Sequence, residues 1–282
     1  MVSTTSLLMS IYNKVSPDAL KDCLTSLANQ TRLPQQFVIV KDGPLTSELE
    51  ELVNNFSEQF SNITQIINIK TNQGLINALN TGLNHCTEDW IIRMDADDIA
   101  MLWRIERQMG YLESHPDIDV LGSAMLEFEE SPSKPLRLKP VVSGHERIVK
   151  QLAIRNPINH PSACIRKTSL IEIGGYPNLY LLEDYFLWAK MINANARFHN
   201  LEEALISYRF DDSTLVRRRG RQNFNNECKL RWWIYQHQLS SIWGLLKGIG
   251  IQLVLRFSPL FLQRYLWHAT RVQVPGRSKE TT

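Results

Sequence analysis

WIIRMDADD, residues 90–98, is the most informative stretch of the chain, because an apolar run is followed at once by three carboxylates. The run 90–94 predicts a buried strand that ends at Asp95, Asp97 and Asp98. Two carboxylates at i and i+2 on a turn can bind one hard cation, and a diphosphate supplies further oxygen ligands. Mg²⁺ or Mn²⁺ there would neutralise the charge of a leaving nucleoside diphosphate. The alternative is a solvated acidic turn, with Asp98 capping the following helix.

Strands and helices alternate on the N-terminal side of this stretch. Apolar runs predict strands at 6–12, 37–40 and 63–70, and helical spacing predicts helices starting at 16–18, over 45–60 and over 74–85. This alternation is typical of an α/β fold with a mostly parallel sheet. Ligands of such sheets bind beyond the carboxyl ends of the strands, where Asn13, Asp42 and Asp95 are expected.

Two further motifs follow strand ends. Asp42, in the sequence KDG, can accept the N3–H of a uracil ring, and Tyr12, in SIYN, can stack on its face. A plain turn is the alternative for Asp42 and Gly43. Gly74, in NQGL, would let the start of a helix approach a diphosphate, although a glycine kept for helix packing explains it equally well.

The C-terminal half of the sequence adds one candidate catalytic group. The segment 183–194 predicts a helix that opens with Glu183 and Asp184. Acids at a helix N-terminus are stabilised by the helix dipole, so simple capping is one interpretation. The functional interpretation is that Asp184 takes a proton from an acceptor hydroxyl as general base.

The acids and prolines of 124–143 predict an irregular connection.

The composition limits the class of protein. The chain has 282 residues, and only 21% of them are charged, which argues against global disorder. The four cysteines are far apart and form no CxxC pair, so a zinc site or disulfide framework is not expected and a reducing cytosol fits. The N-terminus lacks the features of a signal peptide. We therefore expect cytoplasmic chemistry.

The C-terminal region, 222–282, differs from the rest of the chain. From 229 onward it carries eight Lys and Arg against one acid, and charges and Pro259 interrupt its apolar runs before they reach the length of a membrane span. On a helical wheel, Gln252, Arg256 and Gln263 share one side and leave a broad apolar face. The pattern predicts an amphipathic helical extension lying in the membrane plane. Ordinary core helices are the alternative.

The motifs SIYN, VKDG, NQGL, MDADD, GGYP and EDYFLW, taken in order over 6–221, resemble the family-2 glycosyltransferases with a GT-A (Rossmann-like) fold, especially the bacterial amylovoran and O-antigen enzymes. The resemblance implies a catalytic domain at 1–221, with a nucleotide-binding half at about 1–100 and an acceptor half at about 101–221. It also implies an inverting transfer of one hexose or N-acetylhexosamine from a UDP-sugar. The expected acceptor is a lipid-linked, undecaprenyl-diphosphate saccharide at the inner face of the inner membrane, and the expected linkage is β-1,3.

The resemblance also implies residue roles. Tyr12 and Asp42 would hold the nucleotide base, Asn72 and Gly74 would line the donor pocket, Asp95 would contact the ribose or sugar side, Asp97 would bind Mn²⁺ or Mg²⁺, and Asp184, supported by Glu183, would be the catalytic base. The chain departs from the family pattern twice. Lys41 stands where many members have a first acid, and residues 214–220 lack the QxxRW motif of processive members, which favours a single transfer.

Two other classes of protein compete with this interpretation. A sugar nucleotidyltransferase would need a Gly-rich phosphate loop after the first strand, and residues 10–14 contain no glycine. A membrane or nucleic-acid binding module could use Arg217, Arg218, Arg219 and Arg221. A mildly acidic body with a basic, aromatic-rich C-terminal region suits an anionic membrane better than a duplex. His160 could contact phosphate or acceptor, but a core or loop histidine fits better.

Overall fold

The computed structural model describes residues 3–129, 131–210 and 220–274 of the chain. Its N-terminal half is the predicted parallel sheet, in the order β4-β1-β2-β3. The strands are β1 (Thr5–Ile11), β2 (Gln36–Asp42), β3 (Thr64–Ile69) and β4 (Trp90–Asp95), and the connecting helices are α1 (Pro17–Ala28), α2 (Ser47–Gln59) and α3 (Leu75–Leu83). These elements confirm the predicted alternation, and Pro17 opens its helix as expected.

The C-terminal half extends the same sheet with mostly antiparallel pairs. Strand β8 (Cys164–Arg166) pairs with β4 and with β6 (Val120–Phe128), which also pairs with β7 (Arg137–Lys139) and, in parallel, with the long β9 (Phe198–Arg209). The short β5 (Ile99–Ala100) pairs with β9 beyond the acidic turn, and β10 (Val272–Gln273) pairs with β7. The helices of this half are α4 (Arg104–Ser114), α5 (His145–Leu152), α6 (Lys167–Glu172) and α7 (Glu183–Asn193), with the 3-10 turn η1 (His160–Ser162).

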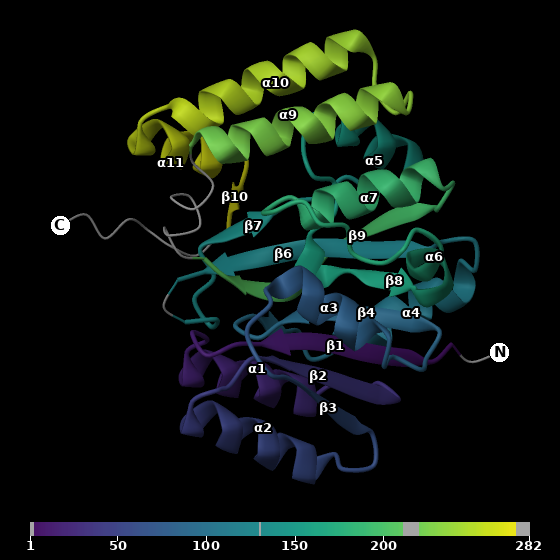
Figure 1. Ribbon diagram of the computed structural model, residues 1–282, viewed down its shortest axis with the longest axis vertical. Coiled ribbons are helices and arrows are strands. Elements are labelled where there is room, and N and C mark those ends of the chain that lie inside the picture. The colour runs from purple at the N-terminus through teal and green to yellow at the C-terminus, as the bar shows by residue number, and fades with distance from the viewer. Residues whose placement is uncertain (1–2, 130, 211–219, 275–282) are drawn as a thin grey trace.

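Helices cover both faces of the sheet (Figure 1). One buried cluster contains Leu79 of α3, Ile148 of α5 and Trp188 of α7, and the other contains Leu20 of α1, Val53 of α2 and Met109 of α4. Strands covered on both faces are apolar throughout, which is why β1, β2 and β4 appear in the sequence as continuous apolar runs rather than alternating ones.

The predicted irregular connection over 124–143 is wrong in part. Strand β6 continues to Phe128, and Arg137–Lys139 forms β7 against it. Glu127 is fully buried there because Arg137 and Arg271 both approach its carboxylate, at 3.5 and 2.9 Å. Paired charges of this kind allow an acid inside a buried strand, so its presence in the sequence misled the prediction.

The C-terminal helices lie across one end of the molecule (Figure 1). They are α9 (Arg221–Gln236), α10 (Ile242–Phe257) and α11 (Leu260–Ala269). Leu230 and Ile234 of α9 join the same buried cluster as Trp188, so α9 packs as a core helix. The break at Pro259 falls where it was expected. No described helix is long and apolar enough to cross a bilayer. Arg217, Arg218 and Arg219 lie outside the described residues.

Candidate active site

The strand register places three of the predicted site residues at one edge of the sheet. Ser10 of β1 lies opposite Asp95 of β4, and Ile11 lies opposite Lys41, the residue before Asp42. Tyr12 follows directly and is 40% exposed, so its ring is accessible at this edge. Because β1, β2 and β4 run parallel, their carboxyl ends meet here, as expected for a ligand-binding edge of an α/β sheet.

Asp42 organises the turn that precedes α3. Its carboxylate accepts hydrogen bonds from the backbone N–H groups of Gln73 (2.7 Å) and Gly74 (2.9 Å), and the Asn72 side-chain amide donates to its carbonyl oxygen (3.1 Å). Gly43 has φ +88°, and a Cβ there would lie 2.8 Å from the Asn72 nitrogen, which makes glycine necessary. Asp42 itself is 3% exposed. Its contact with a nucleotide base stays a prediction, whereas its role in holding residues 72–74 is structural.

Gly74 is the residue immediately before α3. Its φ of +86° belongs to the region that favours glycine, and a Cβ there would meet no atom within 4 Å. Open space therefore lies beside this residue, at the start of the helix. The first backbone N–H groups of a helix are suited to an anion such as a diphosphate.

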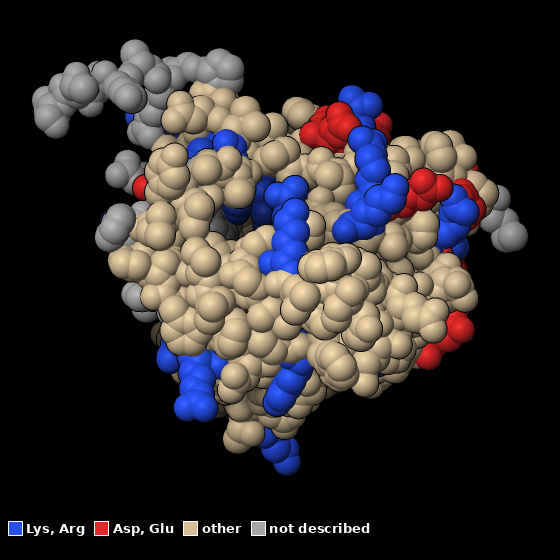
Figure 2. Space-filling model, turned by 90° about the horizontal axis from the view of Figure 1, so that it is seen from above, with Lys and Arg blue, Asp and Glu red and all other residues tan. Residues whose placement is uncertain are grey.

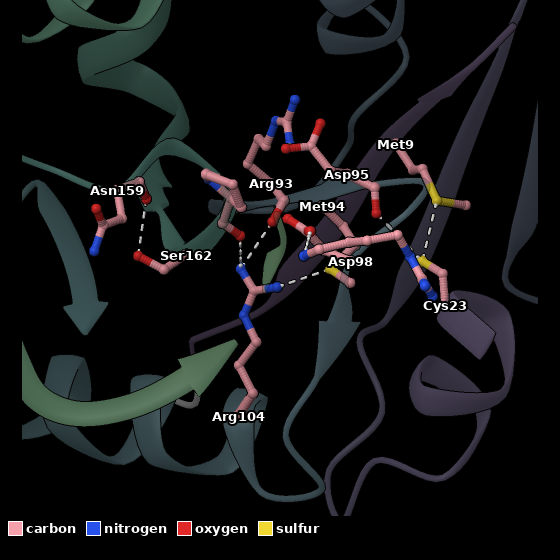
Figure 3. A network of polar contacts seen from close by, with 11 residues as sticks. Met9, Cys23, Arg93, Met94, Asp95, Asp98, Arg104, Asn159 and Ser162 are labelled. Atoms are coloured by element: carbon pink, nitrogen blue, oxygen red, sulfur yellow. Dashed lines mark hydrogen bonds and ion pairs between the residues drawn. The ribbon is translucent and has the colours of Figure 1, made fainter. Parts of the chain in front are cut away.

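The three carboxylates at the end of β4 have different environments, and Figure 3 shows those of Asp95 and Asp98. Asp95 forms an ion pair with the buried Arg93, whereas Asp97 is exposed. Asp98 is fully buried and accepts a hydrogen bond from the backbone N–H of Arg209 (3.0 Å). The alternative in which Asp98 caps the next helix is wrong, because β5 follows it and α4 begins only at Arg104.

This cluster holds more negative charge than its surroundings compensate. Although Asp97 is exposed, desolvation by the surrounding protein, and then the charge of Asp95, raises its pKa from 3.8 to about 6. Burial, then the charges of Asp95 and Asp97, holds the pKa of Asp98 well above its ordinary value. Among residues 3–129, 131–210 and 220–274, no group of three or more His, Cys, Asp or Glu side chains could hold a metal by itself. The exposed Asp97 carboxylate nevertheless fits a Mg²⁺-type ion, since such ions use one or two carboxylates plus substrate phosphates.

Asp184 lies in the first turn of α7, as predicted. Its carboxylate accepts hydrogen bonds from the Asn156 side-chain amide (2.7 Å) and from the backbone N–H of Tyr185 (2.7 Å). Asn156 was not identified from the sequence. The pair Asn156-Pro157, a common turn signal, was the feature that could have drawn attention to it. A carboxylate held in place by an amide donor has the arrangement of a general base with an orienting partner.

Arg231, on α9, binds the backbone of residues 153–154, just before the Asn156 that contacts Asp184. Its guanidinium donates to the carbonyl oxygens of Ala153 (2.8 Å) and Ile154 (3.0 Å), and it lies over the ring of Tyr185. The Tyr185 hydroxyl in turn donates to the carbonyl of Leu152. The C-terminal region therefore helps to position the residue that follows the predicted base, a contact that sequence reasoning missed.

Tyr176, in the GGYP turn, is held to α3 through Asn80. The side-chain amide of Asn80 both donates to the Tyr176 carbonyl (2.9 Å) and accepts from its N–H (2.8 Å). Burial raises the pKa of the Tyr176 hydroxyl, and the charges of Asp95 and Asp184 both contribute to that increase. Tyr176 is therefore within electrostatic reach of both predicted functional carboxylates.

His160 is a core residue rather than a phosphate ligand. It is buried, and its ring meets those of Tyr176 and Trp188 edge-on. Burial, followed by the nearby charge of Arg93, holds the pKa of His160 well below its ordinary value. Burial therefore disfavours the charged form of this imidazole, which argues against a role in binding phosphate.

Comparison with known proteins identifies the family of this chain. A sequence profile of glycosyl transferase family 2 matches residues 6–174. The chain belongs to that family. It is therefore a glycosyltransferase, and the nucleotidyltransferase and non-enzymatic binding-module interpretations are set aside.

Two curated relatives match nearly the whole glycosyltransferase. The UDP-Gal:α-D-GlcNAc-diphosphoundecaprenol β-1,3-galactosyltransferase of Escherichia coli is 33% identical over 262 residues, covering 93% of this chain and 94% of that protein. The amylovoran biosynthesis glycosyltransferase AmsE of Erwinia amylovora is 33% identical over 267 residues, covering 94% of this chain and 98% of that protein.

Solved structures establish the fold of the glycosyltransferase. S. aureus TarS 1–349 superposes with a TM-score of 0.64 at 19% identity, covering 90% of this chain and 72% of that one. The mannosyltransferase PcManGT from Pyrobaculum calidifontis, in complex with GDP-Man and Mn²⁺, gives 0.63 at 14% identity, covering 95% and 80%. The predicted GT-A fold is confirmed.

Proposed function

We propose that this glycosyltransferase moves a single hexose or N-acetylhexosamine from a UDP-sugar to a saccharide carried on undecaprenyl diphosphate, with inversion and in a β-1,3 linkage. Such a step belongs to the synthesis of O-antigen, capsule or exopolysaccharide. The Escherichia coli galactosyltransferase, at 33% identity, is named for this donor and acceptor class, and a TarS structure at 17% identity holds UDP-GlcNAc. The observation that carries the proposal is the separation of two kinds of carboxylate: the acids at the sheet edge, of which Asp97 is exposed, and Asp184, oriented by Asn156 in a cavity wall.

The proposed chemistry is one direct displacement. Asp184 accepts the proton of an acceptor hydroxyl as that oxygen bonds to the anomeric carbon of the donor sugar, and the bond from that carbon to the diphosphate breaks. Asp97 and the diphosphate would hold Mn²⁺ or Mg²⁺, which neutralises charge on the departing UDP. Tyr12 would stack on the uracil, Asp42 would face its N3–H, and Asp95 would face the ribose or sugar. Asn72, Gly74 and the start of α3 would line the diphosphate site.

The experiment compares Asp184→Asn with the wild type and with Glu183→Gln. Sugar transfer to a synthetic GlcNAc-diphosphate-lipid is read by mass spectrometry over a panel of UDP-sugars, with Mn²⁺ or with EDTA. Loss of a general base costs about 10²–10⁴ in rate, so Asp184→Asn should retain about a hundredth or less of the transfer rate while still binding UDP. Glu183→Gln should be milder. Transfer by Asp184→Asn above about a tenth of the wild-type rate would show that another residue is the base.

We also propose that the enzyme works at the inner membrane surface and that α10 faces the lipid. The exposed side of this helix carries large apolar side chains, namely Trp243, Leu246, Leu253, Val254 and Phe257. Its polar side points inward, since Gln252 is buried and Arg256 pairs with Glu227 of α9 at 2.6 Å. An apolar face turned toward solvent is suited to the interface of a bilayer.

The charges on this end of the molecule favour an anionic bilayer. Figure 2 shows Lys and Arg side chains over a mostly uncharged surface, with the acids gathered toward one side. Each basic residue near an anionic surface contributes on the order of 1 kcal/mol, and tryptophans such as the 77% exposed Trp243 suit the headgroup zone.

Liposome flotation tests the membrane proposal. Leu253→Glu and Phe257→Glu place a charge on the outer face of α10, and we expect both to lose flotation with anionic vesicles at low salt. Ile171→Glu is the matched control, because Ile171 on α6 is 53% exposed against 51% for Leu253. A wild-type protein that stays at the bottom of the gradient, or variants that float as well as it does, would contradict α10 as the membrane contact.

A further inference from the structure

A cavity of about 270 Å³ lies between the start of α7 and the C-terminal helices. Asp184 and Asn156 contribute to its wall, together with Gln252 and Arg256 of α10 and Gln263 of α11. Ligand pockets are usually about 300–1,000 Å³, so this one suits a short headgroup rather than a long oligosaccharide. Because Asp184 is the predicted base, a group held in this cavity lies next to the residue that would accept its proton.

The cavity is lined by more positive than negative charge. Its charged side chains are Lys139, Arg155, Arg256 and Arg271 against Asp184 and Glu227. The Arg271 guanidinium pairs with the buried Glu127 and the Arg256 guanidinium with Glu227, so both are fixed in place. Arg155 is exposed, and the described hydrogen bond of its guanidinium is a long one of 3.4 Å to the Gln151 side chain. Guanidinium groups in a cavity wall are suited to bind phosphate.

The wall also contains a buried polar group that points to a ligand. Gln252 is 6% exposed, and its side-chain oxygen has no hydrogen-bond partner among the described residues. An unsatisfied buried polar atom costs about 1–3 kcal/mol, so such groups normally have a partner. The hydroxyl of a sugar would supply one. The inward-facing polar side of α10 thus contributes to the cavity, while its apolar side stays outside.

We infer that this cavity binds the sugar-diphosphate headgroup of the lipid acceptor, an inference that rests on the proposed function. The acceptor sugar lies against Asp184 and Gln252. The diphosphate lies against Arg155, with Arg256 and Arg271 behind it. The lipid leaves the cavity along the apolar outer face of α10. The C-terminal helices α10 and α11 thereby contribute to both the membrane contact and the acceptor site, so the C-terminal region is part of the active site.

Binding of a short-chain GlcNAc-diphosphate-lipid, measured by titration calorimetry without donor, tests the inference independently of catalysis. We expect Arg155→Gln to weaken binding about tenfold, and Gln252→Leu to weaken it similarly. Lys150→Gln is the matched control, since Lys150 is an exposed cation on α5 that does not line the cavity. An alkyl GlcNAc without phosphate should be insensitive to Arg155→Gln but sensitive to Gln252→Leu.

The outcomes separate the two proposals. A wild-type protein that binds this probe with the expected variant pattern but transfers no sugar to it would contradict the proposed function and leave the cavity assignment standing. A wild-type protein that transfers sugar, with Arg155→Gln and Gln252→Leu both indistinguishable from Lys150→Gln, would overturn the cavity assignment. A wild-type protein that shows no binding at millimolar probe would also overturn it.

Discussion

The side-chain amide of Asn156 donates a 2.7 Å hydrogen bond to the carboxylate of Asp184, joining the loop after α5 to the first turn of α7. A donor to a carboxylate favours its charged form and fixes its orientation. The proposed base therefore depends on a residue 28 positions earlier in the chain, on a loop that carries no acidic motif.

Asn156→Ala should reduce kcat about tenfold and shift the acidic limb of the pH–rate profile to higher pH. The shift has this sign because loss of a donor to the charged form raises the pKa of Asp184, so more alkaline conditions are needed to deprotonate it. The measurement is kcat against pH at saturating substrates. Asn54→Ala, on the exposed side of α2, is the control. A lower kcat with an unmoved profile would argue against an electrostatic role for Asn156.

Binding of UDP with Mn²⁺ should weaken as the pH falls below about 6. The pKa of Asp97 is raised to about 6, first by desolvation and then by the charge of Asp95, and a proton on this carboxylate competes with the metal. The increase in melting temperature caused by UDP and Mn²⁺ should therefore shrink between pH 7 and pH 5. Asp97→Ala should abolish that increase at every pH while leaving the ligand-free melting temperature near the wild-type value. An unchanged increase in Asp97→Ala would remove Asp97 as the metal ligand.

The stability of the ligand-free enzyme should fall as the pH rises above 4, and Asp98→Asn should reduce this fall. The pKa of Asp98 in the folded state lies well above its ordinary value of 3.8. Between pH 3.8 and that higher pKa, the folded state therefore binds more protons than the unfolded state. Stability is then present below pH 3.8 and is lost as the pH rises through the folded pKa. Thermal melting in metal-free buffer should give Asp98→Asn the higher melting temperature at pH 8 and a smaller advantage at pH 5. Equal curves for the two proteins would contradict the buried, protonated Asp98.

Arg231→Met should lower the free energy of unfolding by about 3–5 kcal/mol. Arg231 is buried and pairs with Glu227 at 3.2 Å, and its removal weakens this buried ion network, in which Arg256 remains, and leaves the carbonyl oxygens of Ala153 and Ile154 without their guanidinium donor. Chemical denaturation gives the magnitude, and Arg221→Met, at the exposed start of the same helix, should change it by less than about 0.5 kcal/mol. Arg231→Lys should recover only part of the loss, because one ammonium cannot reach both backbone carbonyls. A change below about 1 kcal/mol in Arg231→Met would show that α9 is not fastened by this residue.

The sequence alone predicted the first hundred residues well. The runs that became β1, β2 and β4 are apolar because helices cover both of their faces, and that burial is recorded in each residue's own type. The place of Asp42 and Asp95 at the carboxyl edge followed from the parallel order of the strands. The start of α7 at Glu183 and the break near Pro259 also followed from local signals.

The residues that complete the site were decided by the tertiary structure. Three contacts join residues that lie 28 to 111 positions apart in the sequence. They are the hydrogen bonds of Asn156 with Asp184, of the Arg209 backbone with Asp98, and of Arg231 with the Ile154 carbonyl. Periodicity and turn signals report only whether a residue is buried within its own element. Which side chains meet depends on how elements distant in the sequence cross, so a buried cation beside a carbonyl, or a polar helix face turned inward, becomes visible only once the chain has folded.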